Sequence, residues 1–170
     1  MAGRTCTYHH ISSNNLGRWK ELIIPTIYDE LLEYRKDLSE NYICIGVKYE
    51  KEMAGALIAH IEQVIGDIQI ISIYVRQQFR RRGLGSGMVR KLRDIAATGY
   101  SFERGELGAE VYIKTMYALP AELRRNYEAF LKAVDFTQFY IFKKAAGRKP
   151  ALCGADAMLR IYDLRDDGEY

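Results

Sequence analysis

An apolar strand that runs into a glycine-rich turn and a helix constrains this chain more than any other feature. The run Ile68–Val75 (IQIISIYV) is apolar on both faces, which predicts a central strand covered on each side of a sheet. Three glycines follow, Gly83, Gly85 and Gly87, and a helical pattern begins at Leu84. Glycine lets the backbone approach a ligand closely, and the first amides of a helix attract anions because they have no internal partner. The segment therefore predicts a phosphate cradle made of main-chain amides.

The charge of the same segment strengthens that prediction. Residues 76–93 contain no acidic residue and seven cations: Arg76, Arg80, Arg81, Arg82, Arg90, Lys91 and Arg93. The whole chain has a net charge of +3, so the remainder carries −4. Such a compact patch suits a ligand with clustered phosphates, whereas nucleic-acid binders more often spread cations over a face with interleaved aromatic residues. The plainer alternative is a solvated basic helix cap with a glycine turn.

Two familiar phosphate-binding motifs do not fit the segment. A Walker loop requires Gly-Lys-Ser/Thr after four spacer residues, and the chain has no such run. A dinucleotide fingerprint requires a third glycine at the position of Met88, and it would not account for the arginines.

Length and composition favour one soluble domain over residues 1–170. The chain is 48% hydrophobic and 28% charged, and no apolar run approaches the roughly 20 residues that span a bilayer. The first ten residues lack the apolar core of a signal peptide, so a cytoplasmic location without membrane association is expected. The cysteines, Cys6, Cys44 and Cys153, are far apart and predict neither a disulfide framework nor a metal site.

Periodicity and turn signals predict the order strand, two helices, three strands, helix, strand, helix, two strands. The predicted strands are 4–11, 42–49, 53–62, 68–75, 110–117, 137–142 and 158–164. The apolar residues Leu16, Trp19, Leu22 and Ile23 predict a first helix, and Pro25 is expected to separate it from a second that runs to residue 38.

The pattern Arg/Gln-x-x-Gly-x-Gly/Ala fits the residues from Arg80 to Gly85, and here it resembles the acetyl-CoA pyrophosphate loop of the GNAT superfamily of N-acetyltransferases. The element order agrees with the GNAT arrangement along essentially the whole chain. The resemblance implies an α/β (α+β) GNAT fold, with a mixed central sheet of about seven strands flanked by about four helices. It also implies an acetyl-CoA-dependent acyltransferase with acetyl-CoA as cosubstrate and no metal. The cofactor residues implied are Ile73, Tyr74, Val75, Arg80, Arg81, Arg82, Gly83, Leu84, Gly85, Ser86 and Gly87.

The implied reaction moves an acetyl group from the thioester to a primary amine in a ternary complex. The amine must lose a proton and the thiolate benefits from receiving one, so no cysteine nucleophile is required. Many relatives carry a tyrosine shortly before a Gly-Phe pair at the end of the fourth helix, but this chain has Leu131 and Asp135 at those positions. Tyr127, one helical turn earlier, is the candidate general acid, with core packing as the alternative role.

Candidate general bases lie at two strand ends: Glu62 is the first choice, and His60 and Asp67 are alternatives. A water chain to bulk solvent could replace all three. The acidic residues Asp29, Glu30, Glu33 and Asp37 would suit a cationic amine, whether it belongs to a small molecule or to a peptide or protein.

Two other functions compete with the transferase. A CoA-binding sensor or partner module without catalysis is consistent with Leu131 at the tyrosine position. A nucleic-acid-binding domain would use the arginine run, and its affinity would fall steeply with salt. Exposed edge strands permit a monomer or a homodimer.

Overall fold

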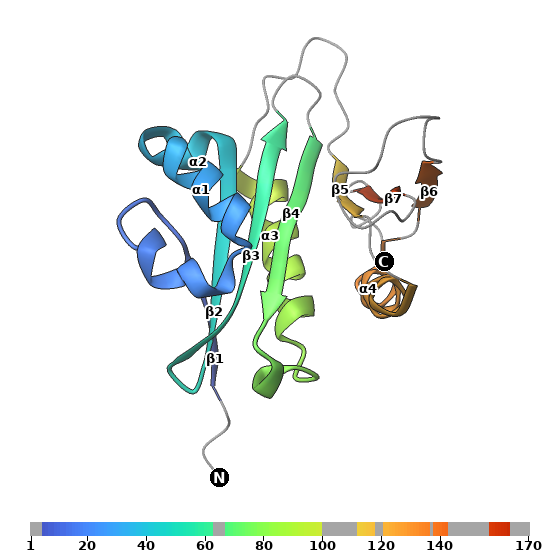
Figure 1. Ribbon diagram of the computed structural model, residues 1–170, viewed down its shortest axis with the longest axis horizontal. Coiled ribbons are helices and arrows are strands. Elements are labelled where there is room, and N and C mark those ends of the chain that lie inside the picture. The colour runs from blue at the N-terminus through green and yellow to red at the C-terminus, as the bar shows by residue number, and fades with distance from the viewer. Residues whose placement is uncertain are drawn as a thin grey trace.

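Seven strands form one mixed sheet, in the order β1-β2-β3-β4-β5-β7-β6, in the computed structural model, which describes residues 5–62, 67–99, 112–117, 121–136, 138–142 and 157–163 (Figure 1). The strands are β1 (Cys6–His10), β2 (Tyr42–Tyr49), β3 (Glu52–Glu62), β4 (Asp67–Val75), β5 (Tyr112–Tyr117), β6 (Gln138–Phe142) and β7 (Ala157–Asp163). Every neighbouring pair is antiparallel except β4–β5, which is parallel. The predicted mixed sheet is confirmed, although residues 4, 110–111, 137 and 164 at predicted strand ends lie outside the described residues.

The helices follow the predicted order, but the second predicted helix, which was expected to run to residue 38, is divided into an α-helix over Pro25–Glu33, a 3₁₀ turn over Arg35–Asp37 and a short α-helix that begins at Leu38. The first predicted helix is the 3₁₀ helix η1 (Leu16–Leu22), and Pro25 begins the next helix rather than merely interrupting the chain. The remaining elements are α1 (Pro25–Glu33), η2 (Arg35–Asp37), α2 (Leu38–Asn41), η3 (Gln77–Phe79), α3 (Leu84–Gly99) and α4 (Ala121–Ala133). Proline is well suited to the first turn of a helix because its missing N–H would have no internal partner there.

Two hydrophobic clusters cover the two faces of the sheet. One contains buried residues of α3 and α4, among them Met88, Leu92 and Leu131, packed on β2, β3 and β4. The other joins η1, α1 and α2 to the opposite face through residues such as Trp19 and Leu31. Figure 1 shows α3 on one side of the strands and α1 and α2 on the other. The central strands are therefore covered on both faces, as their apolar sequence predicted.

The chain's only tryptophan marks the contact between η1 and the sheet. Trp19 is 3% exposed and lies over Gly46 of β2, where an added Cβ would come within 2.3 Å of the indole ring. Glycine at this position is thus required by close packing rather than by backbone conformation.

Strand β4 changes its pairing at its midpoint. Ile58 of β3 is opposite Ser72 whereas Ala59 is opposite Ile70, so Ile71 is the additional residue of a β-bulge. On the other edge, the parallel pairing with β5 ends at the pair Ile70–Thr115. Strand β4 continues to Val75 along β3 beyond the last residue that β5 pairs with it.

Among the described residues, none of the helices combines the length and apolar character needed to cross a membrane.

Candidate active site

The glycine turn connects β4 to α3 through two residues with positive φ. Gly83 has φ 74° and Arg81 has φ 63°, both in the left-handed region. No atom lies within 4 Å of a Cβ built on Gly83, so its conformation, and not crowding by neighbours, favours glycine there. The turn therefore leaves the Cα of Gly83 exposed immediately before α3.

The first turn of α3 supplies the predicted amides. The Gly87 amide donates to the Gly83 carbonyl at 2.9 Å, which is the first internal bond of the helix. Helix geometry then leaves the amides of Leu84, Gly85 and Ser86 without an internal acceptor, at the positive end of the helix dipole. Three adjacent N–H groups of this kind can hold a diphosphate.

Gly85 and Gly87 allow side chains from other elements to pack closely against the start of α3. A Cβ on Gly85 would lie 3.1 Å from the Phe130 ring of α4, and one on Gly87 would collide with the Tyr8 hydroxyl of β1. Because its amide is bonded within the helix and its Cα is covered, Gly87 is not among the free donors of the cradle, although the sequence had suggested it as one.

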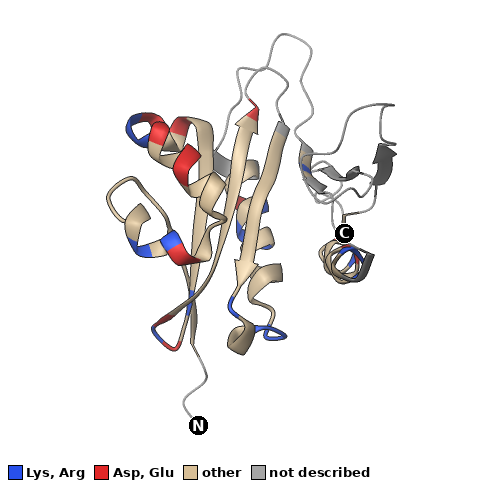
Figure 2. Ribbon diagram, in the orientation of Figure 1, with Lys and Arg blue, Asp and Glu red and all other residues tan. Residues whose placement is uncertain are grey.

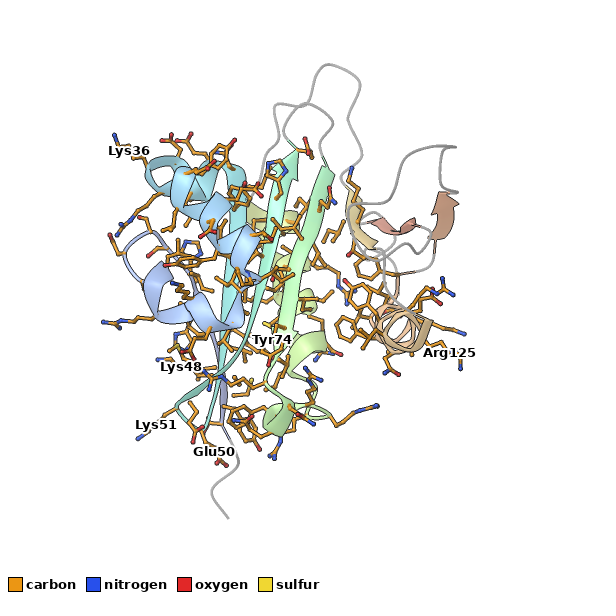
Figure 3. The ribbon with its side chains drawn as sticks, viewed as in Figure 1. Lys36, Lys48, Glu50, Lys51, Tyr74 and Arg125 are labelled. Atoms are coloured by element: carbon orange, nitrogen blue, oxygen red, sulfur yellow. The ribbon has the colours of Figure 1, made fainter. Side chains whose placement is uncertain are left out.

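The open edge of β4 lies next to the cradle. The Arg76 amide donates to the Ala54 carbonyl of β3 at 2.8 Å, and backbone groups alternate between the two edges of a strand. The amides and carbonyls of Ile73 and Val75 therefore face away from β3, on the edge where the described part of β5 no longer pairs. The Tyr74 backbone faces β3, and its side chain, labelled in Figure 3, is 39% exposed near the end of the strand.

The candidate acid Tyr127 is held at the point where β4 and β5 separate. Its hydroxyl is 2.9 Å from Oγ1 of Thr115, the last residue of β5 paired with β4. Thr115 is 2% exposed, and the Tyr127 ring stacks near Phe130 with 6.2 Å between centroids. Tyr127 thus packs partly in the core, as the alternative reading expected, and presents its hydroxyl to the buried threonine.

At the position where many proteins with this loop carry a tyrosine, this chain has a leucine, as its sequence shows. Leu131 is fully buried in the cluster beneath α3 and α4. Asp135, at the family's glycine position, has φ 66°, so this residue keeps a backbone conformation that glycine adopts readily. The turn after α4 is therefore preserved while the hydroxyl is absent from position 131.

The candidate bases His60 and Glu62 form one pair on the other face of the sheet. His60 Nδ1 lies 3.2 Å from Glu62 Oε1, and the His60 ring is 5.1 Å from that of Tyr42. Tyr42 donates a hydrogen bond of 2.5 Å to Glu30 of α1, and burial together with this carboxylate raises the pKa of the Tyr42 hydroxyl above its usual range. Asp67 pairs with Glu62 through the backbone, and its side chain lies outside the described residues.

The charges separate toward two ends of the described molecule. Acidic residues outnumber cations on α1, η2 and α2, with Asp29, Glu30, Glu33, Asp37 and Glu40 against Arg35 and Lys36, whereas the cations of the glycine turn lie at the opposite end of β4 (Figure 2). The part of the chain that the structure describes holds no cluster of three or more metal-ligating side chains. This polarity places an anion-attracting surface and a cation-attracting surface on one sheet.

The Thr115–Tyr127 contact was not foreseen from the sequence. The two residues come from β5 and α4, and no local pattern relates them. The pairing of His60 with Glu62 could be recognised from the sequence, because residues i and i+2 of a strand lie on the same face.

Acetyltransferases are found both in the family profile and among the solved structures that match this chain. The profile of the acetyltransferase (GNAT) family matches residues 9–126, whereas no curated protein sequence matches the chain. Among solved structures, a spermidine N-acetyltransferase from Vibrio cholerae has a TM-score of 0.67 at 13% identity, with 96% of each chain covered. A diaminobutyrate acetyltransferase from Paenibacillus lautus, solved with L-2,4-diaminobutyric acid and coenzyme A, has a TM-score of 0.62 at 16% identity, covering 95% of this chain and 97% of that chain. The likeness to these structures shows a common fold, and the family match, which spans most of the sequence, shows that this chain belongs to the acetyltransferase (GNAT) family.

Proposed function

We propose that this protein transfers the acetyl group of acetyl-CoA to a primary amine by direct attack in a ternary complex. The observation that carries the proposal is the adjacency of three features: the free amides of residues 84–86, the open edge of β4 and the Tyr127 hydroxyl. Together they match a ligand with a diphosphate at one end, an amide-containing arm in the middle and a thioester at the other end.

The cosubstrate would be held mainly by the backbone. The amides of Leu84, Gly85 and Ser86 would bind the diphosphate, with the turn from Arg80 to Gly83 surrounding it. Ile73 and Val75 offer backbone groups on the open edge of β4 to the pantetheine arm, and the Val75 carbonyl already accepts a bond from Arg80 Nε at 2.8 Å. Such an extended ligand would continue the sheet where β5 departs, so its thioester would lie near the Ile70–Thr115 pair.

In the chemical step, the neutral amine nitrogen forms a bond to the carbonyl carbon while the carbon–sulfur bond breaks. Tyr127, held by Thr115, would give its proton to the departing thiolate and regain one from solvent. An acid near the leaving sulfur is useful because Leu131 leaves the family's usual position without a hydroxyl.

The proton of the amine would leave on the other face of the sheet. The His60–Glu62 pair faces the side covered by α1 and α2, where the carboxylate beside Nδ1 favours a proton on that nitrogen and leaves Nε2 as the acceptor. Glu62 lies three residues further along β3 than the pair partner of Ile70, about 10 Å away, so the transfer would proceed through His60 or through water.

The charge distribution supports a cationic amine as the acceptor. The surface around α1 and α2 is acidic, and the ring of Tyr34 lies 5.6 Å from that of Tyr42, beside Glu30. The two solved neighbours named above are described by their substrates as acting on small amines, which favours a small-molecule acceptor here over a protein amine.

The direct test combines calorimetry with a turnover assay. Purified protein should bind CoA by titration calorimetry, and acetyl-CoA with a panel of di- and polyamines, amino acids and peptides should release free thiol. Binding with no turnover across the panel would point instead to a CoA sensor. No binding of CoA at millimolar concentration would refute the proposal.

A further inference from the structure

A row of polar side chains crosses four strands on the face of the sheet that α1 and α2 partly cover. Tyr42 of β2 is opposite His60 of β3, and His60 is opposite Gln69 of β4. Gln69 is in turn opposite Lys114 of β5. Residues directly opposite each other in neighbouring strands lie on the same face. Because Tyr42 belongs to the hydrophobic cluster beneath α1 and α2, the whole row lies on that face.

The alternation of side chains along β5 gives the same orientation for Lys114. Thr115, the next residue, faces α4 on the other side of the sheet, where its Oγ1 lies 2.9 Å from the Tyr127 hydroxyl. Successive side chains of a strand point to opposite faces, so Lys114 is directed away from α4. Lys114 and the candidate acid Tyr127 therefore lie on opposite faces of the sheet, at the point where the described part of β5 stops pairing with β4.

The two ends of the row carry opposite charges. Glu62 Oε1 lies 3.2 Å from His60 Nδ1 at one end, and Lys114 supplies a cation at the other. The side chains of His60 and Glu62 are 31% and 39% exposed, and Gln69 and Lys114 are half-buried, so a small ligand can reach this part of the row. Two strand spacings separate His60 from Lys114, about 10 Å between Cα atoms, and both side chains are long enough to reach inward over Gln69.

We propose that the acceptor is a free amino acid: Lys114 binds its carboxylate, and the His60–Glu62 pair faces its reacting nitrogen. The inference rests on the proposed function. That function places the thioester near the Ile70–Thr115 pair, one residue from Lys114. A carboxylate held by Lys114 would therefore bring a nitrogen a few bonds away to the carbonyl carbon. A lysine ammonium has three donors, so it can bind a carboxylate beside the contact that Lys114 makes within the chain.

The same lysine would disfavour diamines and polyamines. A second ammonium group at the β5 end of the row would lie against Lys114, and the two cations would repel each other. Attraction of the correct ligand and repulsion of its competitor both contribute to specificity. The acidic surface of α1 and α2 stays suited to the ammonium groups of an amino acid, whose carboxylate distinguishes it from a simple diamine.

The test compares two amines that differ only by a carboxylate. L-Lysine and cadaverine form one such pair, and L-ornithine and putrescine form another. The value of kcat/KM is measured for each by thiol release in wild type and in Lys114→Gln. The substitution should lower kcat/KM about tenfold or more for the better amino acid, the low end for a charge-assisted hydrogen bond, and should not lower it for the corresponding diamine. The two compounds differ in basicity equally in every variant, so the change in their ratio isolates the carboxylate.

The kinetic parameter that changes identifies a binding role. Lys114 would hold the carboxylate equally in the bound substrate and in the transition state, so Lys114→Gln should raise KM for the amino acid and leave kcat nearly unchanged. Lys114→Arg keeps the charge and should retain most of the preference. Lys91→Gln is the matched control, because it removes the same charge from an exposed residue of α3, on the other face of the sheet (Figure 1). It should change the ratio less than about twofold, since salt screens distant charges.

A measurement on wild type alone covers the case in which Lys114→Gln does not fold. L-Lysinamide lacks the negative charge of L-lysine, and its KM should be about tenfold higher or more. Equal KM values for the two compounds would refute the amino-acid assignment. It is also refuted, while the proposed function stands, if Lys114→Gln changes both members of a pair by the same factor, or if diamines are acetylated and the amino acids are not. If no amine is acetylated, both are refuted.

Discussion

Replacing Tyr127 by phenylalanine separates its catalytic role from its packing role. The substitution keeps the ring that stacks near Phe130 and removes the oxygen that lies 2.9 Å from Thr115 Oγ1. Because Thr115 is 2% exposed, its hydroxyl loses a partner without gaining water, which should lower the free energy of unfolding by about 1–3 kcal/mol. Urea denaturation measures this change directly.

Thr115→Val provides the comparison within the same pair. Valine is close in shape to threonine and removes the buried hydroxyl, while Tyr127, which is only partly buried, keeps its own. The Tyr127→Phe/Thr115→Val double variant should recover part of the stability lost in Tyr127→Phe alone, since replacing both partners by apolar groups is nearly neutral. A coupling of about 1 kcal/mol between the two substitutions is expected.

Turnover measurements then show whether Tyr127 acts as the general acid. If Tyr127 protonates the leaving thiolate, Tyr127→Phe should lower kcat about 100-fold with the best acceptor of the amine panel, whereas Thr115→Val retains the acid and should lose far less. Thiol release per folded molecule is the assay, at a temperature where both variants remain folded. Unchanged kcat in Tyr127→Phe, together with the stability loss, would leave Tyr127 as a packing residue only.

Further substitutions test the turn at Gly83, the helix start at Gly87 and the core at Cys44. Gly83→Val should weaken CoA binding at least tenfold by calorimetry, because a β-branched residue resists φ 74°, whereas Gly83→Asn should stay close to wild type. Gly87→Ala should cost about 1–3 kcal/mol in urea denaturation, and Tyr8→Phe should restore only part, because the ring carbon would still lie 2.6 Å from the new Cβ. Burial raises the pKa of the Cys44 thiol from 9.0 to about 12, so the unfolded chain loses its thiol proton at a lower pH than the folded chain. The free energy of unfolding therefore falls as the pH rises from 9.0 to about 12. The stability difference between wild type and Cys44→Ala should therefore narrow as the pH rises from 9 to 12, and a constant difference would contradict the shift.

The sequence predicted the elements whose signals are local. The strand, turn and helix from Ile68 onward are contiguous, so glycine spacing and apolar periodicity were sufficient to place them. The first helix was predicted without its type, because an α-helix would also bring Leu16, Trp19 and Leu22 to one face. Their three-residue spacing fits a 3₁₀ helix of three residues per turn at least as well.

The arrangement within the candidate site was less accessible to sequence reasoning. Arg80 and Arg82 of the turn carry the same charge, and only their hydrogen-bond partners, Val75 and Tyr49, one of them distant in sequence, show which strand each contacts. The contact between Thr115 and Tyr127 depends on how α4 packs on β5, which no periodicity encodes. Proximity along a strand, by contrast, made His60 and Glu62 recognisable as neighbours.

Because Trp19 packs over Gly46, its intrinsic fluorescence can report on the contact between η1 and β2. The chain has one tryptophan, so fluorescence excited at the red edge of protein absorption comes from Trp19 alone, at the contact between η1 and β2. Undocking of η1 would hydrate this fluorophore and shift its emission to longer wavelength, while events confined to the glycine turn would leave the spectrum unaltered. The N-terminal half of the molecule can thus be watched separately from the cradle, without a label.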